Sequence, residues 1–407
     1  MGSPTYTVQT CLGRGGFGEV YLAIRRTHEG LEKRVAVKVL REDLQGGTQA
    51  VARLRDEARM LALLDHPAIV GVLELTRLAG RVALVTEYVE GTDLARFTRA
   101  DQLLPTRVAC EVAAAVADAL AVACDTPSPD TGRPLMLIHR DIKPENVRLS
   151  RHGEVKLLDF GIARSGQMSR EARTVTGNVP FTIGYTAPET FTSLTQHPPS
   201  DVFALAATLF RLLSGDRFYD ALKLSEQASI SARADRFAEF QESRLARLAA
   251  HPPELVALVR SMTAWDPAAR PTAHQVQLRL EELVPGLPGP PLRRWAREAT
   301  FPETELAEGP LTGKVLQEEQ VATSEVSRPR HPPEPPPPPT NLVHARPAWG
   351  ASSTDGPRPR AEPAVPRPEA GSHCMTWMAL SFSAILLLAA GLTAVVAVAL
   401  TALWMAM

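Results

Sequence analysis

The chain has 407 residues, 44% of them hydrophobic, which is enough to bury a large core and favours one large domain with additional segments. Its formal net charge of −1 argues against a dedicated nucleic-acid binder, because such proteins usually carry a basic excess that displaces counterions from phosphates. The four cysteines are scattered without the spacing of a metal site or a disulfide framework, so a reducing cytosol fits them best.

The first part of the chain predicts a small lobe built mostly from β-strands. Segments rich in β-branched or apolar residues occur at 6–11, 20–25, 34–40 and 82–88, and glycine clusters or charged turns separate the first three. Between the third and fourth of these, 48–64 has the apolar spacing of an amphipathic helix.

After Gly91 the pattern becomes helical and predicts a larger, mostly α lobe. Apolar residues recur at helical spacing in four stretches, at 107–123, 201–214, 253–264 and 273–283. We therefore expect an α+β, two-lobed domain over residues 1–285.

The next segment, 286–374, is predicted to be a disordered linker. Proline dominates 327–368 and includes the uninterrupted run Pro335–Pro339, which favours an extended backbone without a core. The sequence leaves two roles open for this segment, a plain spacer or a ligand for a proline-binding domain.

The last stretch, 375–407, contains no charged residue and exceeds the roughly 20 apolar residues that a transmembrane helix needs. The alternative, a buried core helix, would need later chain to cover it. Arg358, Arg360 and Arg367 precede the stretch and no lysine or arginine follows it, which places its N-terminal side in the cytoplasm. We therefore expect a single-pass cell-membrane protein with a cytoplasmic domain and a C-terminal tail anchor.

A glycine-rich segment lies between the first two predicted strands, with glycines at Gly13, Gly15, Gly16 and Gly18. Without side chains, its backbone amides can approach phosphate oxygens closely. A dinucleotide-binding fold needs a helix directly after such a loop, whereas here a strand follows that ends in Val35-Ala36-Val37-Lys38. Lys38 on a buried strand requires an anionic partner, and the next helix offers Glu57, although Asp56 lies beside it.

The most specific motif is His139-Arg140-Asp141-Ile142-Lys143-Pro144-Glu145-Asn146, followed by Asp159-Phe160-Gly161 and later by Ala187-Pro188-Glu189. In order and spacing, these motifs resemble the eukaryotic-type (Hanks-type) serine/threonine protein kinase family over about 280 of the 407 residues. The resemblance implies a bilobal protein-kinase fold. It also implies transfer of the γ-phosphate of ATP to serine or threonine hydroxyls of protein substrates, in bacterial signalling.

The resemblance assigns a chemical role to each matching residue. Asp141 would accept the proton of the substrate hydroxyl, and Lys143 would neutralise charge on the transferred group. Asn146 and Asp159 would supply oxygen ligands to Mg²⁺, with Mn²⁺ as the alternative cation. A lysine at position 143 resembles the serine/threonine-specific members, since tyrosine-specific relatives usually lack it.

The resemblance also indicates which residues bind the adenine and the ribose of the nucleotide. The segment Thr86-Glu87-Tyr88-Val89 resembles the gatekeeper and hinge, whose backbone binds adenine, and Asp93 is positioned to meet the ribose. The expected ATP-binding residues are Leu12, Gly13, Gly15, Gly16, Gly18, Val20, Ala36, Lys38, Glu57, Glu87, Val89 and Asp93.

Regulation is expected from Arg140, because an arginine directly before the catalytic aspartate resembles kinases whose activation segment is ordered by phosphorylation. We expect autophosphorylation at Thr174 and Thr176, whereas Thr182 resembles a threonine that contacts the catalytic loop. A membrane tether would raise the local concentration and allow two copies, as a homodimer, to phosphorylate each other.

Two further residues match the family in structural roles, and one short segment differs from the family pattern. Asp201 resembles the aspartate that anchors the catalytic loop, and Arg270 resembles the partner of Glu189. Phe181 and Ile183 stand where the family commonly has glycine and proline, so the peptide-binding pocket is expected to differ.

The sequence leaves two other functions in competition with the kinase. A pseudokinase scaffold would bind nucleotide or partners without phosphate transfer, but it would be expected to lack Lys38, Asp141 or Asp159, and all three are present. A recruitment protein would act mainly through its proline-rich segment.

Overall fold

The computed structural model describes residues 3–15, 18–40, 48–160, 183–193, 196–219, 224–301 and 307–317. The predicted transmembrane segment 375–407 and the proline-rich stretch 327–368 lie outside these residues. Within the described part of the chain, no helix is long and apolar enough to cross a membrane.

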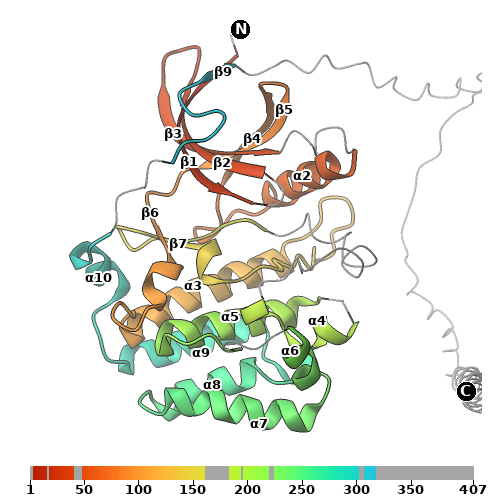
Figure 1. Cartoon of the computed structure of the whole chain (residues 1–407), viewed down its shortest axis with the longest axis vertical. Coiled ribbons are helices and arrows are strands. Elements are labelled where there is room, and N and C mark those ends of the chain that lie inside the picture. Colours follow the sequence, from red (N-terminus) through yellow and green to blue (C-terminus); the bar gives the residue numbers. More distant parts are fainter. Residues whose placement is uncertain are drawn as a thin grey trace, which may run out of the picture. The chain divides into compact units, whose positions relative to one another are not determined.

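The small lobe is a twisted antiparallel sheet with one helix against it (Figure 1). The predicted strands and helix are confirmed, and a further strand, β4, was not predicted. The elements are β1 (Thr5–Arg14), β2 (Gly18–Arg26), β3 (Glu32–Leu40), α2 (Thr48–Leu61), β4 (Val72–Leu78) and β5 (Arg81–Glu87).

The sheet of the small lobe has two differently covered faces, because successive side chains of a strand point to opposite sides. On β3, Val35, Val37 and Val39 are buried in a core on the outer face, whereas Ala36 and Lys38 line a cavity on the inner face. The residues that line the cavity are therefore held by a sheet whose other face must also be covered.

The outer face is covered by chain that follows the large lobe, and here the predicted domain boundary is wrong. Instead of a disordered linker from residue 286, the structure has helix α10 (Leu292–Glu298) and strand β9 (Val315–Gln317). β9 pairs antiparallel with β1 and completes the strand order β4-β5-β3-β2-β1-β9 (Figure 1). A strand of three residues carries too little periodicity to be found in a sequence, and its partner lies about 300 residues away in the chain.

The large lobe is helical, as predicted, and begins with a small sheet that leads from the small lobe into it. The sheet consists of β6 (Gly91–Asp93), β7 (Val147–Ser150) and β8 (Val155–Leu157). The α-helices are α3 (Thr106–Asp125), α4 (Pro188–Ser193), α5 (Pro198–Ser214), α6 (Leu224–Ser231), α7 (Ala234–Leu245), α8 (Pro253–Met262) and α9 (Ala273–Leu283). The short 3₁₀ helices include η1 (Leu94–Thr98), η2 (Pro144–Asn146) and η5 (Ile183–Tyr185).

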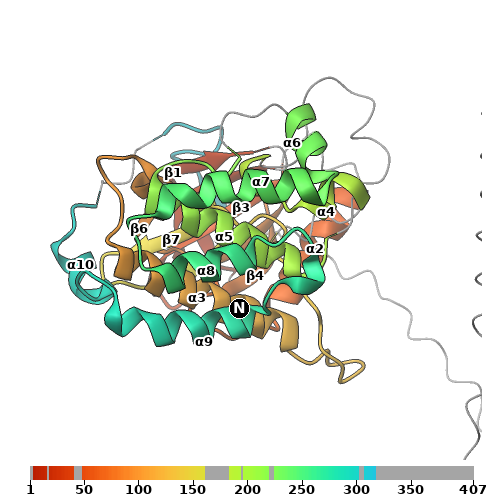
Figure 2. The ribbon, with the colours of Figure 1, turned by 90° about the horizontal axis from the view of Figure 1, so that it is seen from below.

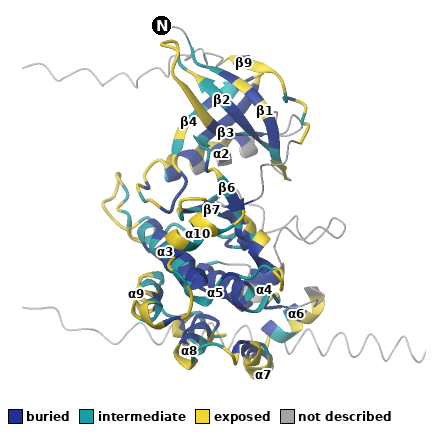
Figure 3. Cartoon of the chain, turned by 90° about the vertical axis from the view of Figure 1, so that its left-hand side faces the viewer, coloured by how far each residue is buried: buried dark blue, intermediate teal, exposed yellow. Residues whose placement is uncertain are grey.

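Helix α5 is the centre of the large lobe. Nearly all of its residues are buried, and α3 and α8 pack against it, while α9 packs against α3 on the lower face (Figure 2). Figure 3 shows how burial decreases outwards: α5 is buried, whereas α7 and α9 present exposed residues to solvent. Gly215 ends α5 in the left-handed conformation, at φ 79°, which glycine adopts without the cost of a Cβ contact.

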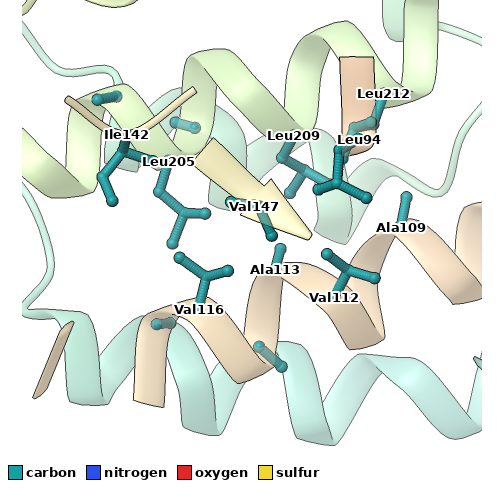
Figure 4. Close-up of a cluster of buried hydrophobic side chains, with 14 of the residues drawn as sticks. Leu94, Ala109, Val112, Ala113, Val116, Ile142, Val147, Leu205, Leu209 and Leu212 are labelled. Atoms are coloured by element: carbon teal, nitrogen blue, oxygen red, sulfur yellow. The ribbon is translucent and has the colours of Figure 1, made fainter. Parts of the chain in front are cut away.

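The core between α3 and α5 also receives the catalytic segment. Ile142 and Val147 point into the layer formed by Val112, Val116 and Leu205 (Figure 4). Because Ile142 is buried, its neighbours Asp141 and Lys143 are held in fixed register on the cavity side.

Candidate active site

A cavity of about 520 Å³ lies between the two lobes. It brings together most of the predicted site residues, from segments far apart in the chain. Those that line it are Leu12, Gly13, Gly15, Gly18, Val20, Ala36, Lys38, Glu87, Val89, Asp93, Asp141, Lys143, Asn146 and Asp159. A pocket of this size is typical of a small-molecule site.

The glycine-rich segment forms the turn between β1 and β2 at the edge of this cavity. Gly18 must be glycine because a Cβ atom there would lie 2.3 Å from the carbonyl oxygen of Val39. At Gly13 and Gly15 a Cβ would meet no other described atom within 4 Å, so their bare amides suit a phosphate rather than packing. Gly16 lies outside the described residues.

Lys38 forms an ion pair across the cavity with Asp159, at 2.9 Å between Nζ and Oδ1. The Lys38 ammonium holds the pKa of the Asp159 carboxyl below its usual range, so this carboxylate remains charged at neutral pH. Glu57 lies on α2, but its side chain is outside the described part of the chain, and the predicted Lys38–Glu57 pair stays a prediction. Asp159 also has a positive φ of 50°, a backbone conformation that is uncommon outside glycine and tends to occur at functional sites.

The hinge residues Glu87, Tyr88 and Val89 line the cavity, and the Glu87 side chain is held by neighbouring groups. The Glu87 carboxylate accepts hydrogen bonds from Lys156 Nζ at 2.6 Å and from the Gly71 amide at 2.8 Å. Arg148, which the sequence analysis did not single out, donates to the carbonyl oxygens of Val89 at 2.7 Å and Gly91 at 2.6 Å. No local motif marks Arg148, since its contacts depend on β7 lying next to β6.

Asp93 has a structural role in addition to its predicted one. Its carboxylate caps η1 by accepting a hydrogen bond from the Ala95 amide at 3.1 Å, and burial raises its pKa. The carboxylate is therefore fixed at the mouth of the cavity, where a ribose hydroxyl would need an acceptor.

The catalytic segment gathers three predicted residues within hydrogen-bonding distance. Lys143 Nζ lies 2.9 Å from Asp141 Oδ2. Asn146 Nδ2 donates to the same carboxylate oxygen at 2.8 Å and to the Asp141 carbonyl at 2.7 Å. The carboxylate is thus oriented by two donors and can serve as a proton acceptor towards the cavity.

Asp201 anchors this segment from inside α5, as predicted. Its two carboxylate oxygens accept from the backbone amides of His139, at 2.6 Å, and Arg140, at 2.8 Å. Burial raises the pKa of Asp201 to about 7, while these two hydrogen bonds oppose the shift. They hold Arg140 at a φ of 69°, a strained conformation for an arginine.

His139 joins the catalytic segment to the start of the activation segment. Its Nε2 lies 2.8 Å from the Leu158 carbonyl, its Nδ1 accepts from the Asp141 amide at 3.3 Å, and its ring packs on Phe160 with centroids 4.6 Å apart. Asp141 and Asp159 are therefore linked through one buried side chain.

Glu189 and Arg270 form the predicted pair in the large lobe. Two parallel hydrogen bonds of 2.9 and 2.7 Å join them, and the guanidinium lies over the Phe203 ring at 5.1 Å. Burial alone would raise the pKa of Glu189, but the hydrogen bonds from Arg270 and Ser200 outweigh it and lower the pKa. The pair ties the segment after the activation loop to the α8–α9 connection.

The remaining predicted site residues lie outside the described part of the chain. They are the phosphorylation sites Thr174 and Thr176 and the pocket residues Phe181 and Thr182.

Comparison with known proteins agrees with this geometry. The protein kinase domain family matches residues 6–279, which is more than half of the chain. The chain belongs to the protein kinase family. The match ends within α9, before α10 begins, so the kinase family pattern does not include the chain that covers the outer face of the small lobe.

Three curated bacterial kinases illustrate the relationship. Serine/threonine-protein kinase PkaB of Streptomyces coelicolor is 33% identical over 70% of this chain and 64% of its own length. Serine/threonine-protein kinase PknB of Mycolicibacterium smegmatis is 35% identical over 53% of this chain and 33% of its length. Tyrosine-protein kinase MasK of Myxococcus xanthus is 34% identical over 51% of this chain and 32% of its length. The chain thus spans between 32% and 64% of the length of these relatives.

Proposed function

We propose that this protein transfers the γ-phosphate of ATP to serine or threonine hydroxyls of protein substrates. The observation that carries the proposal is the arrangement of the catalytic segment, in which Lys143 and Asn146 orient the Asp141 carboxylate beside the Lys38–Asp159 pair. A proton acceptor and a cation near the phosphates are the protein groups that phosphoryl transfer requires.

A divalent cation completes the proposal, and Mg²⁺ is the expected ion. The carboxylate of Asp159 and the amide oxygen of Asn146 are hard oxygen ligands of the kind that Mg²⁺ prefers, and both residues line the same cavity. When bound, the cation would neutralise phosphate charge. Mn²⁺ would be accommodated by the same ligands.

The preference for serine and threonine rests on Lys143, which lies 2.9 Å from the proton acceptor Asp141. One of the relatives is named as a tyrosine kinase, so tyrosine is the competing acceptor. A pseudokinase scaffold is the second competing function.

The test uses the full chain purified in detergent, with radiolabelled ATP, Mg²⁺ and a generic basic protein as acceptor. Acid hydrolysis of the labelled product should release phosphoserine and phosphothreonine. Label on tyrosine alone would overturn the acceptor assignment, and no label above that of Asp141→Ala would favour the scaffold. Asp130→Ala, an exposed aspartate of a surface turn, is the matched control and should retain activity.

We further propose that residues 375–407 span the cell membrane with the kinase domain in the cytoplasm. Support comes from the absence of charge in this stretch and from the three arginines that precede it. The chain should sediment with membranes, resist carbonate extraction and expose its kinase domain to protease only when the cytoplasmic side is accessible. Release into the soluble fraction would contradict the proposal.

Autophosphorylation in trans is proposed as the consequence of tethering. It rests on Arg140, whose backbone amide is held by Asp201, and on the threonines Thr174 and Thr176 of the sequence. An active chain should label a Lys38→Ala copy in mixed micelles, and labelling should fall when detergent dilutes the two copies. Labelling independent of dilution would indicate a reaction in cis.

A further inference from the structure

The segment 307–317, here called the strap, lies against the small lobe after the chain has left the kinase pattern. It is anchored by backbone hydrogen bonds to β1, from the Cys11 amide to the Ala307 carbonyl at 2.9 Å and from the Val8 amide to the Lys314 carbonyl at 2.9 Å. β9 then extends the sheet along the same strand. The strap therefore runs antiparallel to β1, and its first residues lie at the end of β1 that leads into the glycine-rich loop.

The strap also supplies apolar side chains to the core of the small lobe. Leu311 and Leu316 are buried in the cluster that contains Val8, Cys11 and Tyr21 on the outer face of the sheet. Tyr21 is fully buried there. Its neighbour Val20 lines the nucleotide cavity on the opposite face, so the strap packs directly behind the strand that carries a cavity residue.

Two contacts of the strap reach the glycine-rich loop itself. Arg14, which lines the cavity between Gly13 and Gly15, donates from Nη2 to the carbonyl oxygen of Glu308 at 2.6 Å. Gly309 lies so close to Tyr21 that a Cβ atom on it would be 2.6 Å from the ring. The close approach explains the glycine, because its φ lies outside the left-handed range that would otherwise favour one.

Glu19 joins these contacts into one network around the loop. It accepts a hydrogen bond from the Tyr21 hydroxyl at 2.7 Å and lies 3.5 Å from Arg14 Nε. Arg14 and Glu19 are paired residues at the two ends of the glycine turn. Contacts from the strap to Arg14 and Tyr21 therefore act on both strands that carry the turn.

The chain before the strap is fixed to the large lobe near the ribose end of the cavity. Trp295 of α10 and Phe301 pack on Phe97 of η1, with ring centroids 5.2 and 6.3 Å away. Asp93 caps the same η1 helix. Only residues 302–306 separate Phe301 from the strap, so the chain is attached to both lobes within a short length.

We infer that the strap is a positioning element for nucleotide binding. Glu308 holds the glycine-rich loop through Arg14, and Gly309, Leu311 and Leu316 hold it through Tyr21 and its cluster. The inference rests on the proposed kinase function and adds to it residues that the family pattern lacks. Displacing the strap should weaken ATP binding, because the loop amides would no longer be held where the phosphates bind. The chemistry at Asp141 should remain intact, because its anchors lie in the other lobe.

The test compares two matched pairs of variants in the full chain. Gly309→Ala places a methyl group against Tyr21, whereas Gly286→Ala adds one at an exposed position with no described atom within 4 Å. Leu316→Ala removes a buried side chain of β9, whereas Val315→Ala truncates its exposed neighbour. Measurements are KM for ATP, KM for the protein acceptor, kcat, and the affinity for a non-hydrolysable ATP analogue.

We expect Gly309→Ala and Leu316→Ala to raise KM for ATP and the analogue Kd about fivefold, with kcat changed less than about twofold. The two controls should behave as the wild type. If the strap only stabilised the fold, the variants would lower the melting temperature or the active fraction while KM for ATP stayed unchanged, and the inference would be wrong.

A second measurement, hydrogen exchange, tests the inference even if a variant folds poorly. It also distinguishes a failure of this inference from a failure of the proposed function. Hydrogen exchange of peptides covering residues 12–20 should be faster in Gly309→Ala than in Gly286→Ala, with exchange at 139–146 unchanged. Equal exchange in the two variants would overturn the inference. A wild type that binds the analogue but transfers no phosphate would instead refute the proposed function, while the binding comparison would still decide on the strap.

Discussion

The catalytic loop and the glycine-rich loop line the same cavity but are held by different kinds of contact. Asp141 and its neighbours are fixed by buried groups of their own lobe, namely the Asp201 carboxylate, the His139 ring and the Ile142 side chain. The glycine-rich loop is held by a strap from the far end of the domain, through Gly309 and the Glu308 carbonyl. The first set of contacts is buried in the large lobe, whereas the contact between Arg14 and Glu308 is exposed.

This difference divides the expected phenotypes. Changes to the anchors of the catalytic loop should lower kcat, because they misplace reacting groups. Changes to the contacts of the glycine-rich loop should raise KM for ATP, because they affect where phosphates bind before reaction.

The largest effect is expected for the proton acceptor. Asp141→Ala should lower kcat about a thousandfold, since general base catalysis contributes roughly 10²–10⁴-fold. Binding of a non-hydrolysable ATP analogue, measured by calorimetry, should stay within a factor of about two. Residual activity above a tenth of wild type would show that another group accepts the proton.

The ion pair of the large lobe should give the next largest effect, on stability rather than on rate. Arg270→Ala leaves the half-buried Glu189 without its bidentate partner and should cost about 3 kcal/mol in the free energy of unfolding. Arg270→Lys should recover little, because lysine cannot form both hydrogen bonds. Chemical denaturation measures both, and an Arg270→Ala loss below about 1 kcal/mol would contradict the structural role.

The same pair predicts a pH dependence with a defined sign. Because the folded pKa of Glu189 is lowered, its stabilisation is present above the unfolded value of about 4.3 and is lost as pH falls through the folded pKa. Melting temperature should therefore drop more steeply between about pH 5 and 3 in wild type than in Glu189→Gln. Glu239→Gln, on the exposed side of α7, should keep the wild-type slope.

A smaller effect on rate is expected at the anchor in α5. Asp201→Asn replaces one acceptor by an amide donor that faces a backbone N–H, which releases Arg140 from its strained conformation. We expect kcat to fall about thirtyfold with KM for ATP unchanged, as for a small misplacement of the reacting groups. Asp216→Asn, whose carboxylate pairs with Arg247 instead, serves as the control. A rise in KM for ATP without a loss of kcat would contradict the proposal that the anchors of the catalytic loop act on kcat.

The smallest effect is expected for a substitution in β1 that removes side-chain hydrogen bonds to the strap. Buried Thr10 exchanges two hydrogen bonds with Ala307, and Thr10→Val should cost about 1–2 kcal/mol in unfolding free energy. KM for ATP should rise slightly, by about a factor of two. Thr7→Val, at an exposed position of the same strand, should change neither quantity.

Much of the site could be predicted without a structure. Contiguous motifs fixed Asp141, Lys143, Asn146 and Asp159, because phosphoryl transfer needs these groups at short and constant spacing along a loop. The segment Val35-Ala36-Val37-Lys38 likewise predicted that Lys38, on a buried strand, has an anionic partner.

Other contacts depend on residues that meet only after folding. Arg148 at the hinge, the pairing of Lys38 with Asp159 and the strap all join segments far apart in the chain, and no local pattern marks them. The boundary at residue 285 was wrong for the same reason, since α10 and β9 are too short to give a periodic signal and take their stability from surfaces built elsewhere.

The sequence by itself determined the family and the two lobes, and it predicted the catalytic set, because each is encoded in local spacing and composition. Tertiary structure decided how the two loops of the site are held. Hydrogen bonding at the edge of β1 and burial of Leu311 and Leu316 are gained only when a strand at the other end of the domain arrives beside it. Such stabilisation depends on the neighbouring surface, and a short segment of sequence does not specify that surface in advance.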